Sequence, residues 1–352
     1  MLDSLVSHLN CCLFRLSALG DITHVLPLVR ALQQQRPDWR LSWVIGAREQ
    51  QLFSGLDNIE LIPFHKRKGE LGWRQLRQQL STRRFDLLLH LQTSLRANLL
   101  STRIRARRRL GWDRQRSREG HRWMINEPLQ EYPPQHQVQG FLAFARHLGL
   151  AATEPCWDFP ISDEATAFAR KALPGEQPTL IISPCSSHPL RDWTIAGYQA
   201  VARHAIEHHR MRVMVCGGPS EREQDYGQQI AKAHPAVINF VGRDRLHQLP
   251  ALLQRATLVL SPDSGPAHIA NAVGTPVIGL HAATWSRRSG PYNSLHLCVD
   301  RFAEAASRFR NQPPERLRWG SRIEEAGVME LISTDDVIEQ LDSAVHSLSS
   351  DD

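Results

Sequence analysis

Residues 258–280 read LVLSPDSGPAHIANAVGTPVIGL, and they show most plainly how this chain is expected to fold. Leu258–Ser261 and Val277–Leu280 are short and apolar on both faces, which is typical of strands buried inside a parallel sheet. Pro266–Val273 lies between them with helical spacing, and Pro266 suits the first position of a helix. A strand, a helix and a second strand in succession predict an α/β fold.

The same alternation runs through the rest of the chain in two series. Further strands are predicted at Cys11–Leu16, Leu41–Ile45, Ile59–Phe64, Phe85–Leu91, Leu180–Ser183, Arg212–Cys216 and Val237–Val241. Further helices are predicted at His24–Gln35, Arg48–Leu56, Leu71–Arg83, Thr194–His209, Glu221–Ala233 and Leu246–Gln254. The chain is therefore expected to form two doubly wound, Rossmann-like domains that face a central cleft.

Prolines break the sheet pattern between the two series and indicate a linker. We expect a Rossmann-like domain in residues 1–150, the linker in residues 151–178 and a second Rossmann-like domain in residues 179–300. Residues 301–352 form a charged segment with a helical pattern, in which Asp335–Leu348 is predicted to be an amphipathic helix. Ligands bind at the carboxyl ends of the strands in such sheets, so the loops that follow strands are the candidate sites.

Length and composition exclude several classes of protein. The chain has 352 residues, 41% of them hydrophobic, which is enough for two domains with cores of their own. Its six cysteines are scattered and form no disulfide framework or zinc motif, so a reducing compartment fits best. The N-terminus lacks a signal-peptide pattern, and no apolar run is long enough to span a bilayer, so a cytoplasmic protein is expected.

The net charge of +6 is distributed unevenly. Residues 1–150 hold 23 Lys and Arg against 12 Asp and Glu, whereas residues 151–352 hold 19 against 24. Of the basic residues, 38 are Arg, whose planar guanidinium makes bidentate contacts with phosphate and carboxylate. The first half is therefore expected to meet an anionic partner, with nucleic acid, a membrane surface and a small substrate all possible.

Two loops after strands in this pattern carry residues suited to binding an anion. In residues 15–21, RLSALGD, Gly20 allows close backbone approach and Asp21 is placed to face the cleft, although Asp21 would serve equally as a helix cap. In residues 184–193, PCSSHPLRDW, hydroxyls and Arg191 could clasp a diphosphate. An ordinary surface loop with its tryptophan in the core is the alternative.

Two further loops belong to the second series. Residues 217–223, GGPSERE, offer glycines for close approach of a nucleotide and an acidic residue for ribose hydroxyls, or else a tight turn before a helix. The absence of GxGxxG disfavours a nicotinamide or flavin site. In residues 261–268, SPDSGPAH, the backbone N–H groups of Ser264 and Gly265 would point at a phosphate while Asp263 holds a sugar hydroxyl or caps the helix.

Together and in this order, the four motifs resemble the lipopolysaccharide heptosyltransferases of glycosyltransferase family 9. The resemblance spans residues 10–300 and includes AVGTPVIGL after the fourth motif. It implies the GT-B fold and an inverting transfer of L-glycero-D-manno-heptose from ADP-heptose. The acceptor would be Kdo or phospho-Kdo of lipid A, as in heptosyltransferase I, or a heptose already present, as in heptosyltransferase II.

The resemblance also implies roles for single residues. Asp21 matches the catalytic base, and Glu223 is an alternative to Glu221 as the ribose contact. The residues that match donor contacts are Ser187, Arg191, Glu221, Asp263, Ser264, Gly265 and His268. The family often has lysine where Arg191 stands, and arginine keeps the charge with a different reach.

The acceptor is expected on the basic first half. Residues 96–122 hold ten arginines with only Asp113 and Glu119 as acids, and residues 65–68 form a second basic cluster. These arginines are expected to attract Kdo–lipid A and the anionic inner leaflet, with a solvated helix face as the alternative for any one of them. The acceptor-binding candidates are Ser17, Gly20, His24, Arg67 and Arg118.

The implied chemistry needs few groups. One base takes the proton of the acceptor hydroxyl as it attacks the anomeric carbon, and cations and helix N–H groups meet the charge of the departing ADP. The sequence has no Asp-x-Asp motif in a metal-binding context, so no cofactor is expected and a divalent metal is not expected to be obligatory.

Two other functions stay open at this point. A nucleic-acid-binding protein would use the arginine-rich segment, but no RNA-recognition or helix-turn-helix signature is present, so no nucleic-acid partner is expected. A GT-B enzyme with another nucleotide sugar would keep the architecture. Residues 284–293, TWSRRSGPYN, resemble the version in heptosyltransferases that act on a single phosphorylated Kdo. By that resemblance Arg287 or Arg288 could meet an acceptor or donor phosphate, with a flexible basic loop as the alternative.

Overall fold

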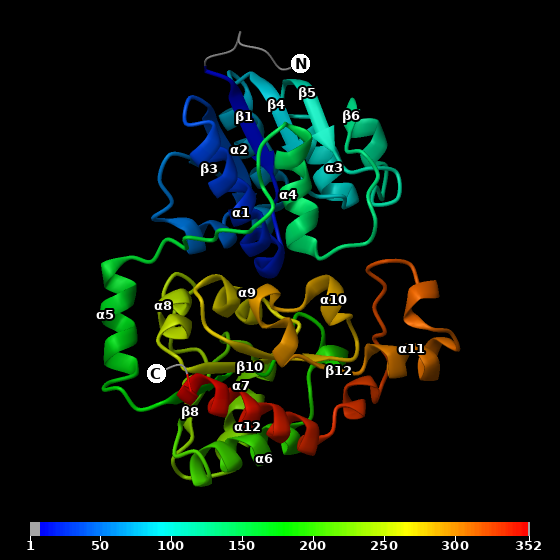
Figure 1. The fold of residues 1–352 in the computed structure, drawn as a ribbon. Helices are drawn as coiled ribbons and strands as arrows, with labels where there is room; N and C mark the ends of the chain where they lie inside the picture. The colour runs from blue at the N-terminus through cyan, green and yellow to red at the C-terminus, as the bar shows by residue number, and fades with distance from the viewer. Residues whose placement is uncertain (1–7, 351–352) are drawn as a thin grey trace. The chain divides into compact units, whose positions relative to one another are not determined.

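The computed structural model describes residues 8–350, and the chain divides between Pro160 and Ile161 into two compact units (Figure 1). Residues 1–7, which include most of the stretch considered for a signal peptide, lie outside the described part. Each unit contains one six-stranded sheet in which every strand runs parallel to its neighbours. No helix in residues 8–350 combines the length and the apolar character that a membrane span requires.

Unit 1 has the strand order β3-β2-β1-β4-β5-β6. Its strands are β1 (Asn10–Phe14), β2 (Arg40–Gly46), β3 (Glu60–Phe64), β4 (Phe85–His90), β5 (Ala106–Gly111) and β6 (Glu127–Pro128). Its α-helices are α1 (Leu19–Gln35), α2 (Gly69–Leu80), α3 (Leu95–Ser101) and α4 (Gln137–His147), with 3-10 turns at Glu49–Phe53, Lys66–Lys68 and His121–Met124. Helices α1 and α4 pack together, while α2 and α3 share a core on the other face of the sheet (Figure 1).

Unit 2 repeats this topology with the order β12-β11-β10-β7-β8-β9. Its strands are β7 (Thr179–Ile182), β8 (Arg212–Val215), β9 (Ile238–Asn239), β10 (Leu258–Pro262), β11 (Val277–His281) and β12 (Val299–Asp300). Its α-helices are α5 (Asp163–Ala172), α6 (Ile195–Glu207), α7 (Glu221–Ala231), α8 (Leu249–Gln254), α9 (Gly265–Ala272), α10 (Ser286–Ser289), α11 (Phe302–Arg310) and α12 (Thr334–Ser350). In both sheets the order in which strands are added reverses beside the first strand, between β1 and β4 and between β7 and β10. Doubly wound folds bind ligands at this switch point.

Every predicted strand is present, and the differences lie in short or polar elements. The helix predicted at Arg48–Leu56 is wrong, because only the 3-10 turn Glu49–Phe53 forms there. The strand predicted at Val237–Val241 pairs with β8 over Ile238–Asn239 alone. Helix α5 lies inside the segment 151–178 expected to be a linker, and its alanines pack against α8 of unit 2.

The arginine-rich segment contains a strand, β5, that the sequence did not predict. Arg108 makes a bidentate pair with Glu127 of β6, at 2.8 and 2.9 Å, and its hydrogen bonds lower the pKa of Glu127. Arg109 donates to the backbone oxygens of Met124, Ile104 and Ser101 at 2.6 to 3.0 Å. The expectation that the arginines of this segment attract an acceptor stays a prediction, and the donors of Arg108 and Arg109 are already engaged in holding the sheet edge together.

Replacing Arg109 with methionine is expected to destabilise unit 1. The variant keeps the apolar stem but leaves half-buried carbonyl groups without their donors, which should lower the free energy of unfolding by about 2 kcal/mol or more. The control is Arg107→Met, since Arg107 is exposed on the same strand and its loss should change stability by less than about 0.5 kcal/mol. Urea unfolding followed by tryptophan fluorescence measures both, and equal effects would refute the structural role of Arg109.

Candidate functional site

The first candidate loop, Arg15–Ala18, joins β1 to α1 at the point where the strand order of the unit 1 sheet reverses. Three contacts fix its backbone and its arginine. The Leu16 amide donates to Gln92 Oε1 at 2.8 Å, and Trp43 Nε1 donates to the Arg15 carbonyl at 3.1 Å. Arg15 Nη1 donates to the Leu91 carbonyl, at the end of β4, at 2.7 Å. These contacts therefore fix the position of the loop at the carboxyl ends of β1 and β4.

Asp21 is the third residue of α1, and its carboxylate is held by two side chains. Arg15 forms an ion pair with Oδ2, and Gln137 of α4 donates to Oδ1. The residue at the N-cap is Ala18, whose amide lies 3.3 Å from Asp21 Oδ2, so the capping role is a weak addition. The side chain stays 27% exposed. A fixed carboxylate that solvent still reaches is suited to accept a proton.

The acceptor candidates lie on three loops at the carboxyl end of the same sheet. Ser17 and Gly20 flank Asp21 and are half-buried, whereas His24, one turn into α1, is buried with its ring centroid 5.6 Å from that of His136. Arg67 is exposed in the turn after β3, and Arg118 is exposed in the loop after β5.

Sequence reasoning missed the groups that position the carboxylate. Arg15 belongs to the quoted motif, so a local signal for it existed. Gln137 had none, because it lies 116 residues from Asp21 along the chain.

A pair of buried histidines supports the end of β4 beside this loop. His90 and His121 have ring centroids 4.4 Å apart. His121 Nε2 accepts from the Trp112 amide at 3.1 Å, so its proton lies on Nδ1, which faces Asn98 Oδ1 at 3.1 Å. Burial, with the charge of Arg109 adding to it, lowers the pKa of His121 to about 4, and burial lowers that of His90 as well. Both rings are neutral at pH 7.

In unit 2, the loop after β7 presents Arg191 to the carboxyl end of the sheet. Arg191 is only 7% exposed, although Ser187 and Leu190 of the same loop are exposed. Its Nη2 donates to Ser187 Oγ at 2.8 Å, and its Nε lies 3.2 Å from Glu324 Oε1. Trp193 anchors the loop, since it is buried and donates to the Ile332 carbonyl at 3.0 Å. A buried guanidinium beside an exposed hydroxyl is a suitable anion contact.

A second ion pair shapes this loop from within. Asp192 Oδ2 lies 3.2 Å from Arg222 Nη1, and Asp192 Oδ1 accepts from the Ser186 amide at 2.6 Å. Burial raises the pKa of Asp192, and these contacts oppose that rise. The loop after β7 is thereby tied to helix α7, which follows the glycine loop.

The contacts of the glycine loop, residues 217–220, distinguish the two candidates for the acidic ribose contact, Glu221 and Glu223. Glu223 Oε1 accepts from the Gly218 amide at 2.7 Å, and its Oε2 accepts from the hydroxyl of Ser220, the N-cap of α7. Glu223 therefore closes the loop and orients Ser220, the residue that caps the helix. Glu221 is exposed in the first turn of α7, which leaves its carboxylate accessible to a ligand.

The fourth loop joins β10 to α9 and carries Asp263. Ser264, and not Asp263, is the N-cap of α9, with its Oγ accepting from the Ala267 amide at 3.3 Å. Asp263 Oδ1 lies 3.2 Å from His268 Nε2, and Oδ2 accepts from Ser289 Oγ at 3.2 Å. Burial would raise the pKa of this carboxyl, but the hydrogen bond and charge of His268 outweigh burial and hold it well below its usual range.

The helix start at Gly265 completes this loop. Gly265 is the first residue of α9, and the helix N-terminus offers its amide groups at the carboxyl end of β10. Asp263 is thus an anchor for His268 and Ser289, and its contact with a sugar stays a prediction.

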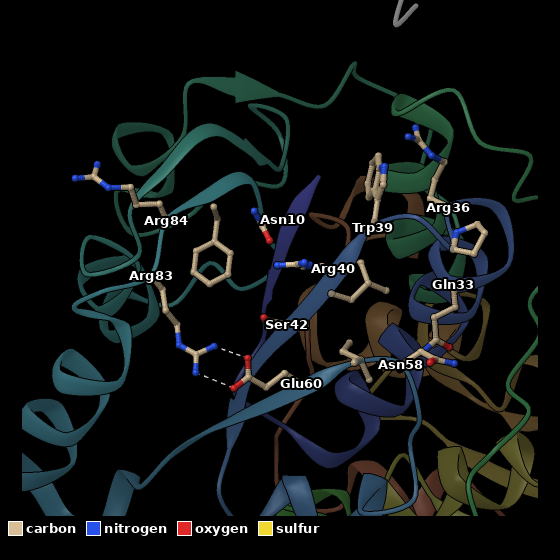
Figure 2. Close-up of a pocket in the computed structure, with 14 residues that line it drawn as sticks. Asn10, Gln33, Arg36, Trp39, Arg40, Ser42, Asn58, Glu60, Arg83 and Arg84 are labelled. Carbon is tan, nitrogen blue, oxygen red and sulfur yellow. Dashed lines mark hydrogen bonds and ion pairs between the residues drawn. The ribbon is translucent and has the colours of Figure 1, made fainter. Parts of the chain in front are cut away.

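A cavity of about 650 Å³ lies at the opposite, amino end of the unit 1 sheet (Figure 2). It opens beside Asn10, Arg40 and Glu60, which begin β1, β2 and β3. Figure 2 shows Arg83 directed at Glu60, with which it forms an ion pair. Within residues 8–350, one group of three His, Cys, Asp or Glu side chains brings its ligand atoms close enough for a metal ion, and none of its members belongs to a candidate loop.

Residues 73–317 match the sequence profile of glycosyltransferase family 9 (heptosyltransferase). The chain belongs to this family. It is 39% identical to the lipopolysaccharide core heptosyltransferase OpsX of Haemophilus influenzae over 94% of this chain and 96% of that protein. The glycosyltransferase predicted from the motifs is confirmed by these matches.

Solved structures confirm the predicted fold. Escherichia coli heptosyltransferase WaaC with ADP superposes with a TM-score of 0.75 at 18% identity, over 95% of this chain and 99% of WaaC. The structure of WaaC with ADP-2-deoxy-2-fluoro heptose gives 0.66 at 19% identity, over 86% of this chain and 100% of that one. The two parallel sheets with their interleaved helices thus form a GT-B glycosyltransferase.

The neutral histidine pair predicts a loss of stability in mild acid. An unfolded histidine takes up a proton near pH 6.5, whereas His121 in the folded chain stays neutral down to about pH 4. The unfolded state therefore binds more protons below pH 6.5, and His121 alone should remove about 2 kcal/mol from the free energy of unfolding between pH 7 and pH 5.

Urea unfolding at several pH values tests this. His121→Gln should flatten the dependence between pH 7 and pH 5, while His296→Gln, at an exposed histidine, should leave it unchanged. The same slope in wild type and His121→Gln would contradict a buried neutral His121.

Proposed function

We propose that this protein transfers L-glycero-D-manno-heptose from ADP-heptose to Kdo of lipid A during synthesis of the lipopolysaccharide inner core. The observation that carries the proposal is the Asp21 carboxylate, which Arg15 and Gln137 hold at the point where the sheet of unit 1 reverses. Membership of the heptosyltransferase family and the 39% identity to a lipopolysaccharide core heptosyltransferase support the sugar and the pathway.

The donor contacts belong to unit 2. Arg191 and Ser187 offer a cation and a hydroxyl to the diphosphate, and the amide groups at the start of α9 offer further donors. Glu221 is the ribose contact, because Glu223 is engaged by the glycine loop. His268, oriented by Asp263, completes the donor loop. The heptose complex of a family structure supports ADP-heptose as the donor.

The reaction inverts the anomeric centre in one displacement. Asp21 takes the proton from the acceptor hydroxyl as its oxygen bonds to the anomeric carbon of the heptose. The bond from that carbon to the diphosphate oxygen breaks, and ADP leaves with the electron pair. Arg191 and the amides of α9 meet the charge that develops on the diphosphate, so these steps need no divalent metal.

The acceptor is expected on the exposed basic loops of unit 1. Arg118, Arg122 and Trp123 line an open cavity of about 490 Å³, and Trp123 is 86% exposed. An exposed tryptophan among arginines suits the interface between lipid headgroups and water. Each arginine near an anionic leaflet adds about 1 kcal/mol to binding, so this loop and Arg67 support peripheral attachment on the cytoplasmic face of the inner membrane.

The other candidates differ in one substrate each. Transfer to a heptose, as in heptosyltransferase II, keeps the donor and changes the acceptor. A GT-B enzyme with another nucleotide sugar keeps the architecture and changes the donor. Neither nucleic-acid binding nor a cofactor is part of the proposal.

Asp21→Asn is expected to lower the rate of ADP release from ADP-heptose in the presence of Kdo–lipid A by about 100-fold or more, because the amide cannot take the proton. Its affinity for ADP, measured by calorimetry, should match that of the wild type. Asp57→Asn, at an exposed aspartate of unit 1, is the matched control and should turn over normally. Normal turnover in Asp21→Asn would remove the base from the mechanism.

Acceptor choice is tested with lipid A that carries Kdo, phospho-Kdo, Kdo-Kdo or a first heptose. We expect transfer to Kdo or phospho-Kdo, and Arg118→Ala should raise the KM for that acceptor about fivefold while the KM for ADP-heptose stays constant. Arg103→Ala, exposed before the amino end of β5, is the control. Transfer only to the heptose-bearing acceptor would favour the heptosyltransferase II reaction instead.

A further inference from the structure

Helices α6 and α12 of unit 2 pack side by side and bring three potential metal ligands together (Figure 1). His204 Nε2 lies 2.7 Å from Asp342 Oδ1, and His209 Nε2 lies 2.5 Å from the same oxygen. The three ligand atoms all lie within 4.8 Å of one another. The heptosyl-transfer mechanism uses none of these residues.

The donor set is one that a divalent transition ion prefers. Two imidazole nitrogens and one carboxylate oxygen bind Zn²⁺ at about 2.0 to 2.2 Å, with water completing a tetrahedron. Ligand atoms of such a tetrahedron lie about 3.3 Å apart, so the two histidines need to withdraw from Asp342 by less than about 1 Å to admit the ion.

Rigid elements present the ligands. His204 lies in the last turn of α6, and the chain reverses directly after His209. The Met211 amide donates to the Ala205 carbonyl at 3.0 Å, which fixes the reversal. Asp342 follows Leu341, which is fully buried in the core that α12 shares with α6. The backbone that carries the three ligands is therefore held in place, as a binding site requires.

The cluster is open to solvent and distant from the donor loops. The Asp342 side chain is 39% exposed, whereas the two histidines are 14 to 18% exposed, so an ion has a path of entry past the carboxylate. Helix α6 begins just after the loop of Arg191, and His204 lies nine residues further along it, which is about 14 Å of helix.

We propose that His204, His209 and Asp342 bind one divalent transition-metal ion of the Zn²⁺ class, which joins the C-terminal helix α12 to the end of α6. The ion has a structural role, because its ligands lie at the far end of α6 from the loop of Arg191. This site is independent of the proposed heptosyl transfer, and its occupancy changes stability and not turnover.

The test uses the full-length protein without a histidine tag, freed of metal by chelation and then titrated with Zn²⁺. Competition with a chromogenic chelator measures the Kd and the stoichiometry, thermal unfolding measures the stabilisation, and the visible absorption of bound Co²⁺ reports the ligand set. The variants are Asp342→Asn and His209→Gln, which keep hydrogen-bonding groups in place. His296→Gln, an exposed histidine of the same unit, is the control.

We expect one ion per chain and a rise in the thermal midpoint with Zn²⁺. Asp342→Asn and His209→Gln should each weaken Zn²⁺ binding at least about 10-fold and abolish the rise in the thermal midpoint. Loss of a residue that only hydrogen-bonds to a metal ligand already lowers metal affinity by about 10-fold, and these variants remove a ligand itself. The control should bind as the wild type does. Equal affinity in wild type and Asp342→Asn, or loss of heptosyl transfer on chelation, would overturn the proposal, and neither result depends on which sugar is transferred.

Discussion

The pairing of β1 with β4, and of β7 with β10, is the constraint on which both sets of candidate residues depend. In each sheet the chain first builds outward on one side of its first strand and then returns to build on the other. The loops after these central strands therefore leave in opposite directions and open a crevice at the carboxyl edge. Asp21 follows β1, Arg191 follows β7 and Asp263 follows β10, so one topological rule, applied twice, positions all three.

The same rule leaves the two aspartates in different electrostatic settings. Asp21 is a quarter exposed and keeps only Arg15 and Gln137 as strong partners. Asp263 is more deeply buried, and both of its oxygens are engaged by His268 and Ser289. A base has to be reached by the hydroxyl that it deprotonates, whereas an anchor does not. The exposed carboxylate is thus the one suited to chemistry, and the buried one to positioning.

Local sequence was enough to predict the buried apolar strands, but it predicted neither the strands β5, β6 and β12 nor the long-range contacts between side chains. The buried strands are apolar on both faces, so each appears as a short hydrophobic run. Strand β5 was missed because its arginines make a polar run in the sequence. Arg108 binds Glu127 of the next strand and Arg109 binds backbone carbonyls such as that of Ser101, and no local pattern reveals these partners. Gln137, Glu324 and the cluster around Asp342 were missed for the same reason, since each meets its partner more than 100 residues away.

The charged side chains that pair within the protein have to be set aside before the net charge can indicate an anionic ligand. Among the ten arginines of residues 96–122, Arg108 is bound to Glu127, and Arg116 is bound to Asp113. Arg109 donates to backbone carbonyls. Arg103 and Arg107 are exposed but lie toward the amino end of the sheet. The exposed arginines that follow carboxyl ends of strands are Arg96, Arg114, Arg118 and Arg122. These four arginines are the candidates for contact with the proposed anionic acceptor, and the large net charge of the N-terminal half overstates the basic surface at this edge of unit 1.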